Sequence, residues 1–191
     1  MKTLVFHGYG QSAVIAKEKW DPIFKKLGIL ATYLEGPLDV VNRKGEAAKG
    51  WFTWESSEEI YKAKKYDHVS DTLIYIDDFI RSNGPFDNII GYSQGGTILS
   101  IYLDRYPIML DNIKRVVIIS SYRPLDPQWY RINSKLDCKT MLVMGELDEI
   151  VPMKYTKDIF HSVDETYIHN GAHIIPTNKV FIDILRSFMK E

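Results

Sequence analysis

Short apolar runs alternate with segments of helical periodicity along the 191 residues of this chain. The apolar runs predict strands over residues 3–6, 29–34, 86–92, 116–119, 141–144 and 166–168. Helices are predicted between several of these strands, and the first should begin after Ser12 as N-cap and end at Gly28. Such alternation predicts an α/β fold with a mainly parallel central sheet and helices on both faces.

Composition narrows the class of protein. The length fits one compact domain over residues 1–191, and 45% hydrophobic residues suffice for a full core. A formal net charge of −1 gives no support for nucleic-acid binding. The single cysteine cannot form an internal disulfide, and we find no signal peptide and no membrane-length apolar run. These features predict a cytoplasmic protein without a membrane span and leave its oligomeric state open.

Two segments lack a clear pattern. Residues 37–66 show no period and are interpreted as a long connection, which carries Trp51, Phe52 and Trp54. Residues 122–139 lie between two predicted strands and are too few for a lid domain, so we expect a shallow or partly open pocket.

The carboxyl ends of the strands are where chemistry is expected in a parallel sheet. The residues that directly follow the apolar runs include two histidines, two serines and an aspartate: His7, Ser93, Ser120, Asp148 and His173. Three of these five are the residue types of a nucleophilic triad.

A G-x-S-x-G motif lies at residues 91–95, which read Gly-Tyr-Ser-Gln-Gly. In a nucleophile elbow, a sharp strand-to-helix turn projects the serine hydroxyl toward a base, and the flanking glycines leave room for the close backbones. The motif follows an apolar strand and opens a helix that cannot comfortably pass Pro107. We therefore predict Ser93 as the nucleophile.

The acid and the base are expected downstream, in the order serine, acid, histidine. Asp148 is favoured because it lies in the turn after the strand 141–144, with Glu146 and Glu149 as rival acids. His173 is favoured as the base because it follows the last strand after a flexible Gly-Ala pair. His169 is expected to pack at the end of that strand.

The oxyanion hole should combine two backbone N–H groups. The residue after the nucleophile, Gln94, starts a helix, so its N–H is free to bind an oxyanion. The second donor is expected in the turn after the first strand, where Tyr9 lies between glycines. The imidazole of His7 is expected to brace this turn rather than to take part in chemistry.

Five motifs in order resemble the FSH family of serine hydrolases, a group with the α/β-hydrolase fold. They are the segments 4–12, 84–95, 119–124, 145–152 and 171–176, which together span nearly the whole chain. The resemblance implies a triad of Ser93, Asp148 and His173 and the hydrolysis of carboxylic esters, or of thioesters in some members. An arginine usual beside the family's aromatic pair is absent here, where residues 49–52 read Lys-Gly-Trp-Phe.

The sequence thus predicts an esterase or thioesterase that acts on small apolar acyl substrates. Its pocket walls are expected to be formed by four aromatic side chains, Trp51, Phe52, Trp54 and Tyr122. Cysteine and histidine spacings match no metal site and no phosphate loop is present, so no metal and no cofactor are expected. The alternatives are a catalytically silent hydrolase-fold protein that binds a hydrophobic small molecule or a partner, and a lyase or peptidase that uses the same triad.

Overall fold

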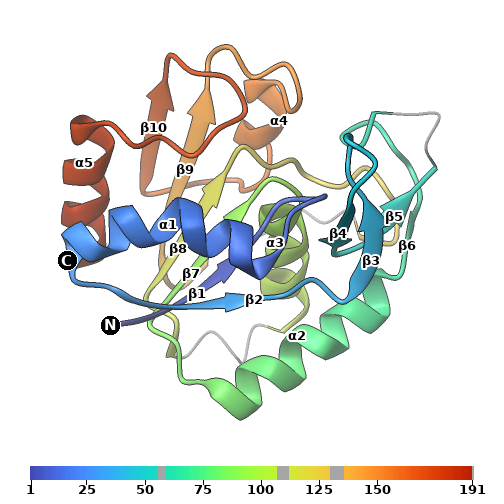
Figure 1. Ribbon diagram of the computed structural model, residues 1–191, viewed down its shortest axis with the longest axis horizontal. Coiled ribbons are helices and arrows are strands. Elements are labelled where there is room, and N and C mark those ends of the chain that lie inside the picture. The colour runs from blue at the N-terminus through green and yellow to red at the C-terminus, as the bar shows by residue number, and fades with distance from the viewer. Residues whose placement is uncertain (56–58, 107–111, 130–135, 191) are drawn as a thin grey trace.

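A six-stranded sheet lies at the centre of the structure, a computed structural model that describes residues 1–55, 59–106, 112–129 and 136–190 (Figure 1). The strand order is β10-β9-β8-β7-β1-β2, and every neighbouring pair is parallel. The strands are β1 (Lys2–Phe6), β2 (Leu30–Leu34), β7 (Asn88–Tyr92), β8 (Arg115–Ile119), β9 (Lys139–Gly145) and β10 (Glu165–His169). The predicted parallel sheet is confirmed.

Five helices accompany the sheet in the described part of the chain: α1 (Ala13–Leu27), α2 (Val69–Asn83), α3 (Gln94–Arg105), α4 (Met153–Lys157) and α5 (Lys179–Lys190). The predicted caps of α1 are confirmed, because the Ser12 hydroxyl accepts a hydrogen bond from the Ile15 amide at 3.2 Å and Gly28 takes the left-handed conformation. Helix α3 ends at Arg105, and Pro107 lies outside the described residues.

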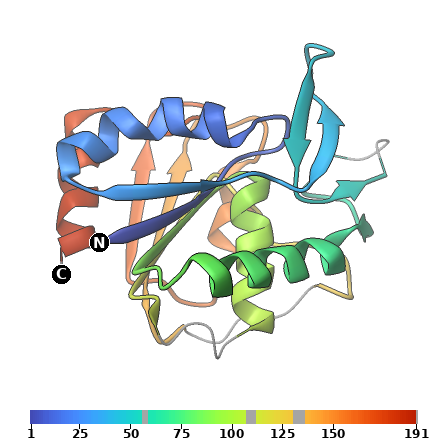
Figure 2. The ribbon, with the colours of Figure 1, turned by 60° about the horizontal axis from the view of Figure 1, so that its bottom comes forward.

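The helices cover both faces of the sheet, as Figure 2 shows. Successive side chains of a strand point to opposite faces, so Val5 of β1 packs with α1 and α5 while Leu4 and Phe6 pack with α2 and α3. The inner strands β7 and β8 are buried along their whole length. This burial explains why they appear in the sequence as continuous apolar runs rather than as alternating ones.

The long connection over residues 37–66 contains short strands that its sequence did not indicate. Four short strands form two antiparallel pairs: β3 (Leu38–Val41) with β4 (Ala47–Gly50), and β5 (Thr53–Trp54) with β6 (Tyr66–Asp67). Strands of two to four residues are too short to show a period in the sequence. The β3–β4 hairpin is tied to the turn after β1, because the Gly10 amide donates to the Lys49 carbonyl at 3.0 Å and the Lys49 amide donates to the Gln11 carbonyl at 2.8 Å.

Candidate active site

Ser93 occupies a sharp turn between β7 and α3. Its backbone angles are φ 53° and ψ −125°, a conformation that costs an L-residue about 1–3 kcal/mol. The turn stays attached to the sheet because the Ser93 amide donates to the Ile119 carbonyl of β8 at 2.9 Å. The side chain of Ser93 is thereby held at the carboxyl end of the sheet.

Glycines make this turn possible. A Cβ atom on Gly91 would lie 2.5 Å from the Cα of Gly96, and one on Gly95 would lie 2.3 Å from the carbonyl oxygen of His7. Both contacts involve backbone, which cannot rotate away as a side chain could. The strand and the helix can approach this closely only where side chains are missing, which is the physical reason for the glycines of the motif.

The structure brings Ser93, His173 and Asp148 together. Nε2 of His173 lies 2.9 Å from Oγ of Ser93, and Nδ1 of His173 lies 2.7 Å from Oδ2 of Asp148. The three side chains follow β7, β10 and β9, three strands that end at the same edge of the sheet. They form one continuous line of hydrogen-bonding groups.

The carboxylate of Asp148 is buried and held on both oxygens. Oδ1 accepts hydrogen bonds from the amides of Ile150 at 3.0 Å and Val151 at 2.8 Å, while Oδ2 faces His173. Burial alone would raise the pKa of Asp148, but the hydrogen bonds from His173 and Val151 outweigh it and the pKa is lowered. An ionised Asp148 accepts a hydrogen bond from the Nδ1–H group of His173, so Nε2 is left as an acceptor for the Ser93 hydroxyl. The rivals Glu146 and Glu149 are exposed.

Tyr92, the residue before the nucleophile, holds the histidine loop. Its hydroxyl donates to the backbone carbonyl of His173 at 2.7 Å, and the two rings lie 5.1 Å apart. The G-x-S-x-G motif therefore fixes His173 as well as Ser93. Sequence reasoning missed this contact, because the second position of the motif can be any residue as far as the turn is concerned.

The amides of Tyr9 and Gln94 are both unused. Among the described residues, neither N–H donates a hydrogen bond to a backbone or side-chain acceptor. Gln94 is the first residue of α3, where an amide has no partner within the helix. Tyr9 lines the same cleft as Ser93. Each of the two N–H groups is thus left without an acceptor in this part of the chain.

Comparison with protein families identifies the group to which this arrangement belongs. The model described as serine hydrolase (FSH1) matches residues 1–185. This chain belongs to that family. The resemblance inferred from the five sequence motifs is therefore confirmed, and the protein is a serine hydrolase by family.

Relatives of this FSH1-family protein vary in length. An esterase of Caenorhabditis elegans is 24% identical over all of this chain and 93% of its own length. A Schizosaccharomyces pombe protein named dihydrofolate reductase is 26% identical over 99% of this chain, but the chain spans only 47% of that relative. Among solved structures, acyl-protein thioesterase 2 of Zea mays superposes with a TM-score of 0.69 at 16% identity, over 98% of this chain and 91% of its own. That likeness shows the α/β-hydrolase fold.

A cleft with a volume of about 850 Å³ opens above the turn of this serine hydrolase. Its lining combines Ser93 and His173 with the turn after β1, the β3–β4 hairpin and apolar side chains, among them Trp54, Ile60, Tyr61 and Ile150. Of the four aromatic side chains expected in the pocket walls, only Trp54 lines this cleft. It packs edge-on against Tyr9 with ring centroids 5.0 Å apart.

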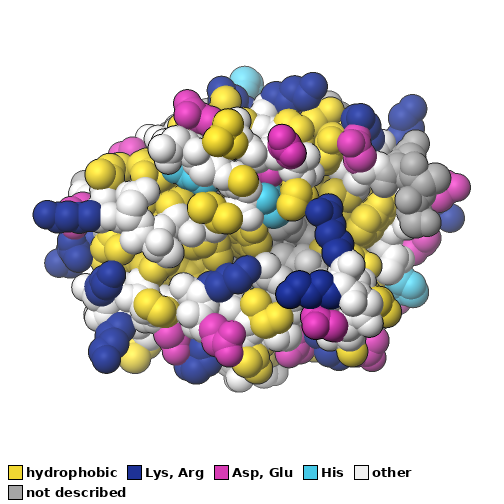
Figure 3. All heavy atoms as spheres, turned by 45° about the horizontal axis from the view of Figure 1, so that its top comes forward, with side chains coloured by type: hydrophobic (Ala, Val, Ile, Leu, Met, Phe, Trp, Pro, Cys, Tyr) yellow, Lys and Arg dark blue, Asp and Glu magenta, His cyan; other side chains and the backbone are white. Residues whose placement is uncertain are grey.

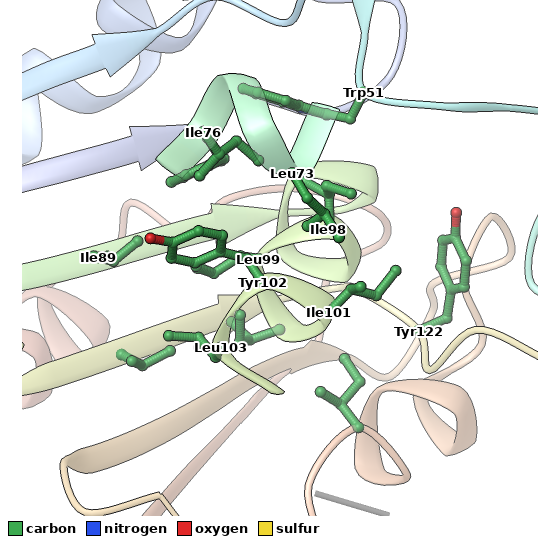
Figure 4. Packing of buried hydrophobic residues seen from close by; sticks show 14 of the residues in the cluster. Trp51, Leu73, Ile76, Ile89, Ile98, Leu99, Ile101, Tyr102, Leu103 and Tyr122 are labelled. Atoms are coloured by element: carbon green, nitrogen blue, oxygen red, sulfur yellow. The ribbon is translucent and has the colours of Figure 1, made fainter. Parts of the chain in front are cut away.

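The other three aromatic side chains, Trp51, Phe52 and Tyr122, are fully buried in the core. Figure 4 shows Trp51 near Leu73 of α2 and Ile98 of α3, and Tyr122 at the edge of the same cluster of buried residues. Their expected place in the cleft is therefore corrected. Aromatic composition alone could not separate a pocket wall from a core residue, because both environments favour large apolar side chains.

The side chain of Gln94 has a structural role that the sequence did not reveal. Its buried side-chain oxygen accepts from the Trp51 amide at 2.9 Å, and its side-chain nitrogen donates to the Phe52 carbonyl at 2.8 Å. The side chain thus holds the segment between β4 and β5 against the turn, while the backbone N–H of the same residue has no acceptor among the described residues. The sequence feature that could have indicated this role is the glutamine at the fourth position of the G-x-S-x-G motif.

His7 braces the turn after β1, as expected. It is buried, its Nδ1 lies 2.8 Å from the Gly8 carbonyl, and its Nε2 accepts from the Gly36 amide at 2.9 Å. Since Nε2 accepts a hydrogen bond, the proton of the neutral ring is on Nδ1. The indole Nε1–H of Trp51 donates to the His7 carbonyl at 2.7 Å and so holds the same turn in place.

We expect His7 to stay neutral with its proton on Nδ1 at pH 6.5. Burial lowers its pKa, and the weaker effects of Gly8 and Glu35 do not reverse this. Stability linked to His7 is therefore complete above about pH 6.5 and is lost as the pH falls below that value, since the unfolded state then binds the proton first. NMR titration of the labelled imidazole checks this, and a His7 signal that titrates at or above pH 6.5 would contradict it.

His169 is the last residue of β10 and its Nδ1 accepts from the Gly171 amide at 3.1 Å, in line with the role expected for it. Over the described ranges, no group of three or more histidine, cysteine, aspartate or glutamate side chains is arranged to hold a metal ion. Within the same ranges, no helix is both long and apolar enough to cross a membrane.

Proposed function

We propose that this protein hydrolyses carboxylic esters or thioesters of small apolar acyl substrates through Ser93, His173 and Asp148. The observation that carries the proposal is the unbroken hydrogen-bonded line from Asp148 Oδ2 through His173 to Ser93 Oγ, at 2.7 and 2.9 Å. A serine hydroxyl becomes an effective nucleophile when such a base accepts its proton during attack.

In the proposed reaction, Ser93 Oγ attacks the substrate carbonyl while its proton passes to His173 Nε2. Asp148 stabilises the imidazolium that results, and the amides of Tyr9 and Gln94 hold the oxyanion of the tetrahedral intermediate. The intermediate collapses when His173 gives its proton to the departing alcohol or thiol, which leaves an acyl group on Ser93. Water, activated by the same histidine, then releases the acid and restores the serine.

The apolar side of the cleft supports an acyl substrate. Trp54, Ile60 and Tyr61 line the same cleft as Ser93 and would pack against a hydrocarbon chain. The name esterase of the nematode relative points to the same class. Discrimination between chain lengths is expected to be modest, since one methylene is worth only about 1–3 kcal/mol.

A fluorophosphonate probe tests the proposal. We expect the purified protein to be labelled at Ser93, as located by peptide mass spectrometry, and labelling to collapse in His173→Ala. The matched control is His161→Ala, which removes an exposed histidine outside the cleft. A folded wild-type protein that takes up no probe would overturn the proposal and favour a catalytically silent hydrolase-fold binding protein. A panel of esters, thioesters and peptides then separates esterase from peptidase activity.

The hydroxyl of Tyr92 is expected to matter for turnover. Tyr92→Phe keeps the ring beside His173 but removes the 2.7 Å hydrogen bond to its carbonyl, so the imidazole is held less firmly. Because small misplacements of a catalytic group are costly, we expect kcat to fall about tenfold with KM nearly unchanged. Steady-state ester hydrolysis measures both constants. Tyr33→Phe, whose hydroxyl bonds Asp21 instead, is the control, and equal kcat in the two variants would refute the expectation.

A further inference from the structure

Three cationic side chains, Lys19, Arg43 and Lys44, line the cleft that contains Ser93 and His173. In the part of the chain that the structure describes, none of the three takes part in an ion pair. They come from two elements far apart in sequence, since Lys19 lies on α1 and the other two lie in the turn of the β3–β4 hairpin. The fold thus collects unpaired positive charge at one cleft.

Neighbouring lysines on the same two elements do have partners. Lys17 on α1 pairs with Asp21 at 2.9 Å, and Lys49 on β4 pairs with Asp39 at 2.7 Å. Neither Lys17 nor Lys49 lines the cleft. On these two elements, Lys17 and Lys49 are thus paired outside the cleft, while the three cations that line the cleft are not paired.

The acidic side chains of the cleft do not balance this charge. Among the described cleft residues, the carboxylates are Glu59 and Glu149, and Glu59 is already paired with Lys62. One unpaired carboxylate therefore faces three unpaired cations. In a concave site, charges of one sign raise the local concentration of a ligand of the opposite sign.

Lys19 lies close to the residues of the proposed chemistry, and the hairpin that carries the other two cations is joined to the turn of Tyr9. The Lys19 ammonium is 5.6 Å from the centre of the Tyr92 ring, and Tyr92 in turn bonds His173. Figure 2 shows α1 and the β3–β4 hairpin together on one side of the molecule, and the hairpin is bonded to the turn that carries Tyr9. Figure 3 views the face where β9 and β10 end and shows Lys and Arg side chains around a hollow with hydrophobic atoms in it.

We propose that the substrate carries an anionic group, a carboxylate or a phosphate, several bonds away from the scissile carbonyl, and that Lys19, Arg43 and Lys44 bind it. This inference rests on the proposed function. The hydrocarbon part of the substrate packs on Trp54 and Tyr61, and the anion selects among esters of similar size. Because each contact is partly solvated, the three cations act together and no single one dominates.

Matched pairs of esters test the inference. In one pair the acyl chain ends in a carboxylate or in its neutral amide, as in the mono-4-nitrophenyl ester of adipic acid and the corresponding adipamide ester. In the other pair the leaving group carries the charge, as in 3-carboxyphenyl hexanoate and 3-carbamoylphenyl hexanoate. We expect kcat/KM to favour the anionic member of one pair about tenfold at low ionic strength, and the pair that responds tells which part carries the anion.

Variants and salt complete the test. Lys19→Gln, Arg43→Gln and Lys44→Gln should each reduce the anion preference about twofold to threefold, and the triple variant should abolish it. High salt should weaken it, because screening shortens the reach of charge to about 3 Å at 1 M. Lys26→Gln, an exposed lysine of α1 outside the cleft, is the control and should leave the preference unchanged.

Two results would overturn the inference while the proposed function stands. One is equal kcat/KM within both ester pairs, and the other is an anion preference that survives in the triple variant. In each case Ser93 must still be labelled by the fluorophosphonate probe. Failure of the proposed function looks different, because then no ester of either pair is cleaved and Ser93 takes up no probe. In that case the inference falls with it.

Discussion

Asp148→Asn is expected to lower kcat for ester hydrolysis about 10⁴-fold while the fold is kept. The reason lies in the two oxygens of this carboxylate. Oδ1 accepts hydrogen bonds from the amides of Ile150 and Val151, so an asparagine must keep its only oxygen at that position. Its NH₂ group then faces Nδ1 of His173, which lies 2.7 Å from Oδ2 in the native protein.

A donor opposite Nδ1 forces His173 into the wrong tautomer. Nδ1 becomes the acceptor and the ring proton moves to Nε2, which then donates toward Ser93 and can no longer accept the proton of the hydroxyl. The loss is therefore expected in kcat rather than in KM. Circular dichroism and steady-state kinetics on the same preparation separate this effect from unfolding.

Glu146→Gln is the matched control, because Glu146 is an exposed carboxylate in the same turn and was a rival for the acid on sequence grounds. We expect it to change kcat less than about twofold. If Asp148→Asn keeps more than a tenth of the native kcat, Asp148 does not orient the base and the proposed mechanism is wrong.

Gly95→Ala is expected to destabilise the fold by about 3 kcal/mol or more. The new Cβ would lie 2.3 Å from the carbonyl oxygen of His7 and 2.8 Å from the backbone of Phe6. These atoms belong to the end of β1, which is hydrogen-bonded on both sides within the sheet. Relief of the clash must therefore separate α3 from the sheet, which also displaces Ser93.

Gly28→Ala separates this steric cost from a purely conformational one. Gly28 ends α1 with φ 67°, but a Cβ there would meet nothing within 4 Å. Its substitution should cost about 1 kcal/mol, the strain of an alanine in the left-handed region. Urea unfolding of both variants measures the difference, and equal midpoints would show that the Gly95 contact is not what limits the turn.

Local features of the sequence were sufficient to predict the central sheet, both ends of α1 and the three residues now found within hydrogen-bonding distance. Apolar runs mark buried strands, and Ser12 and Gly28 mark the ends of α1, because burial and capping depend on neighbours in the chain. The positions of Ser93, Asp148 and His173 followed from the G-x-S-x-G motif, from the order serine, acid, histidine, and from the rule that parallel strands end at a common edge.

Only the tertiary structure decided what surrounds those three residues. The strands between residues 38 and 67 are too short to show a hydrophobic period in the sequence. Trp51, Phe52 and Tyr122 are buried in the core, because long-range packing and not residue type decides whether an aromatic side chain lines the cleft or the interior. The hydrogen bonds of the Gln94 side chain to Trp51 and Phe52 likewise join residues distant in sequence. The same is true of the cleft that brings together Lys19, Arg43 and Lys44. These contacts form only when distant segments of the chain come together, so no pattern within one segment of the sequence predicts them.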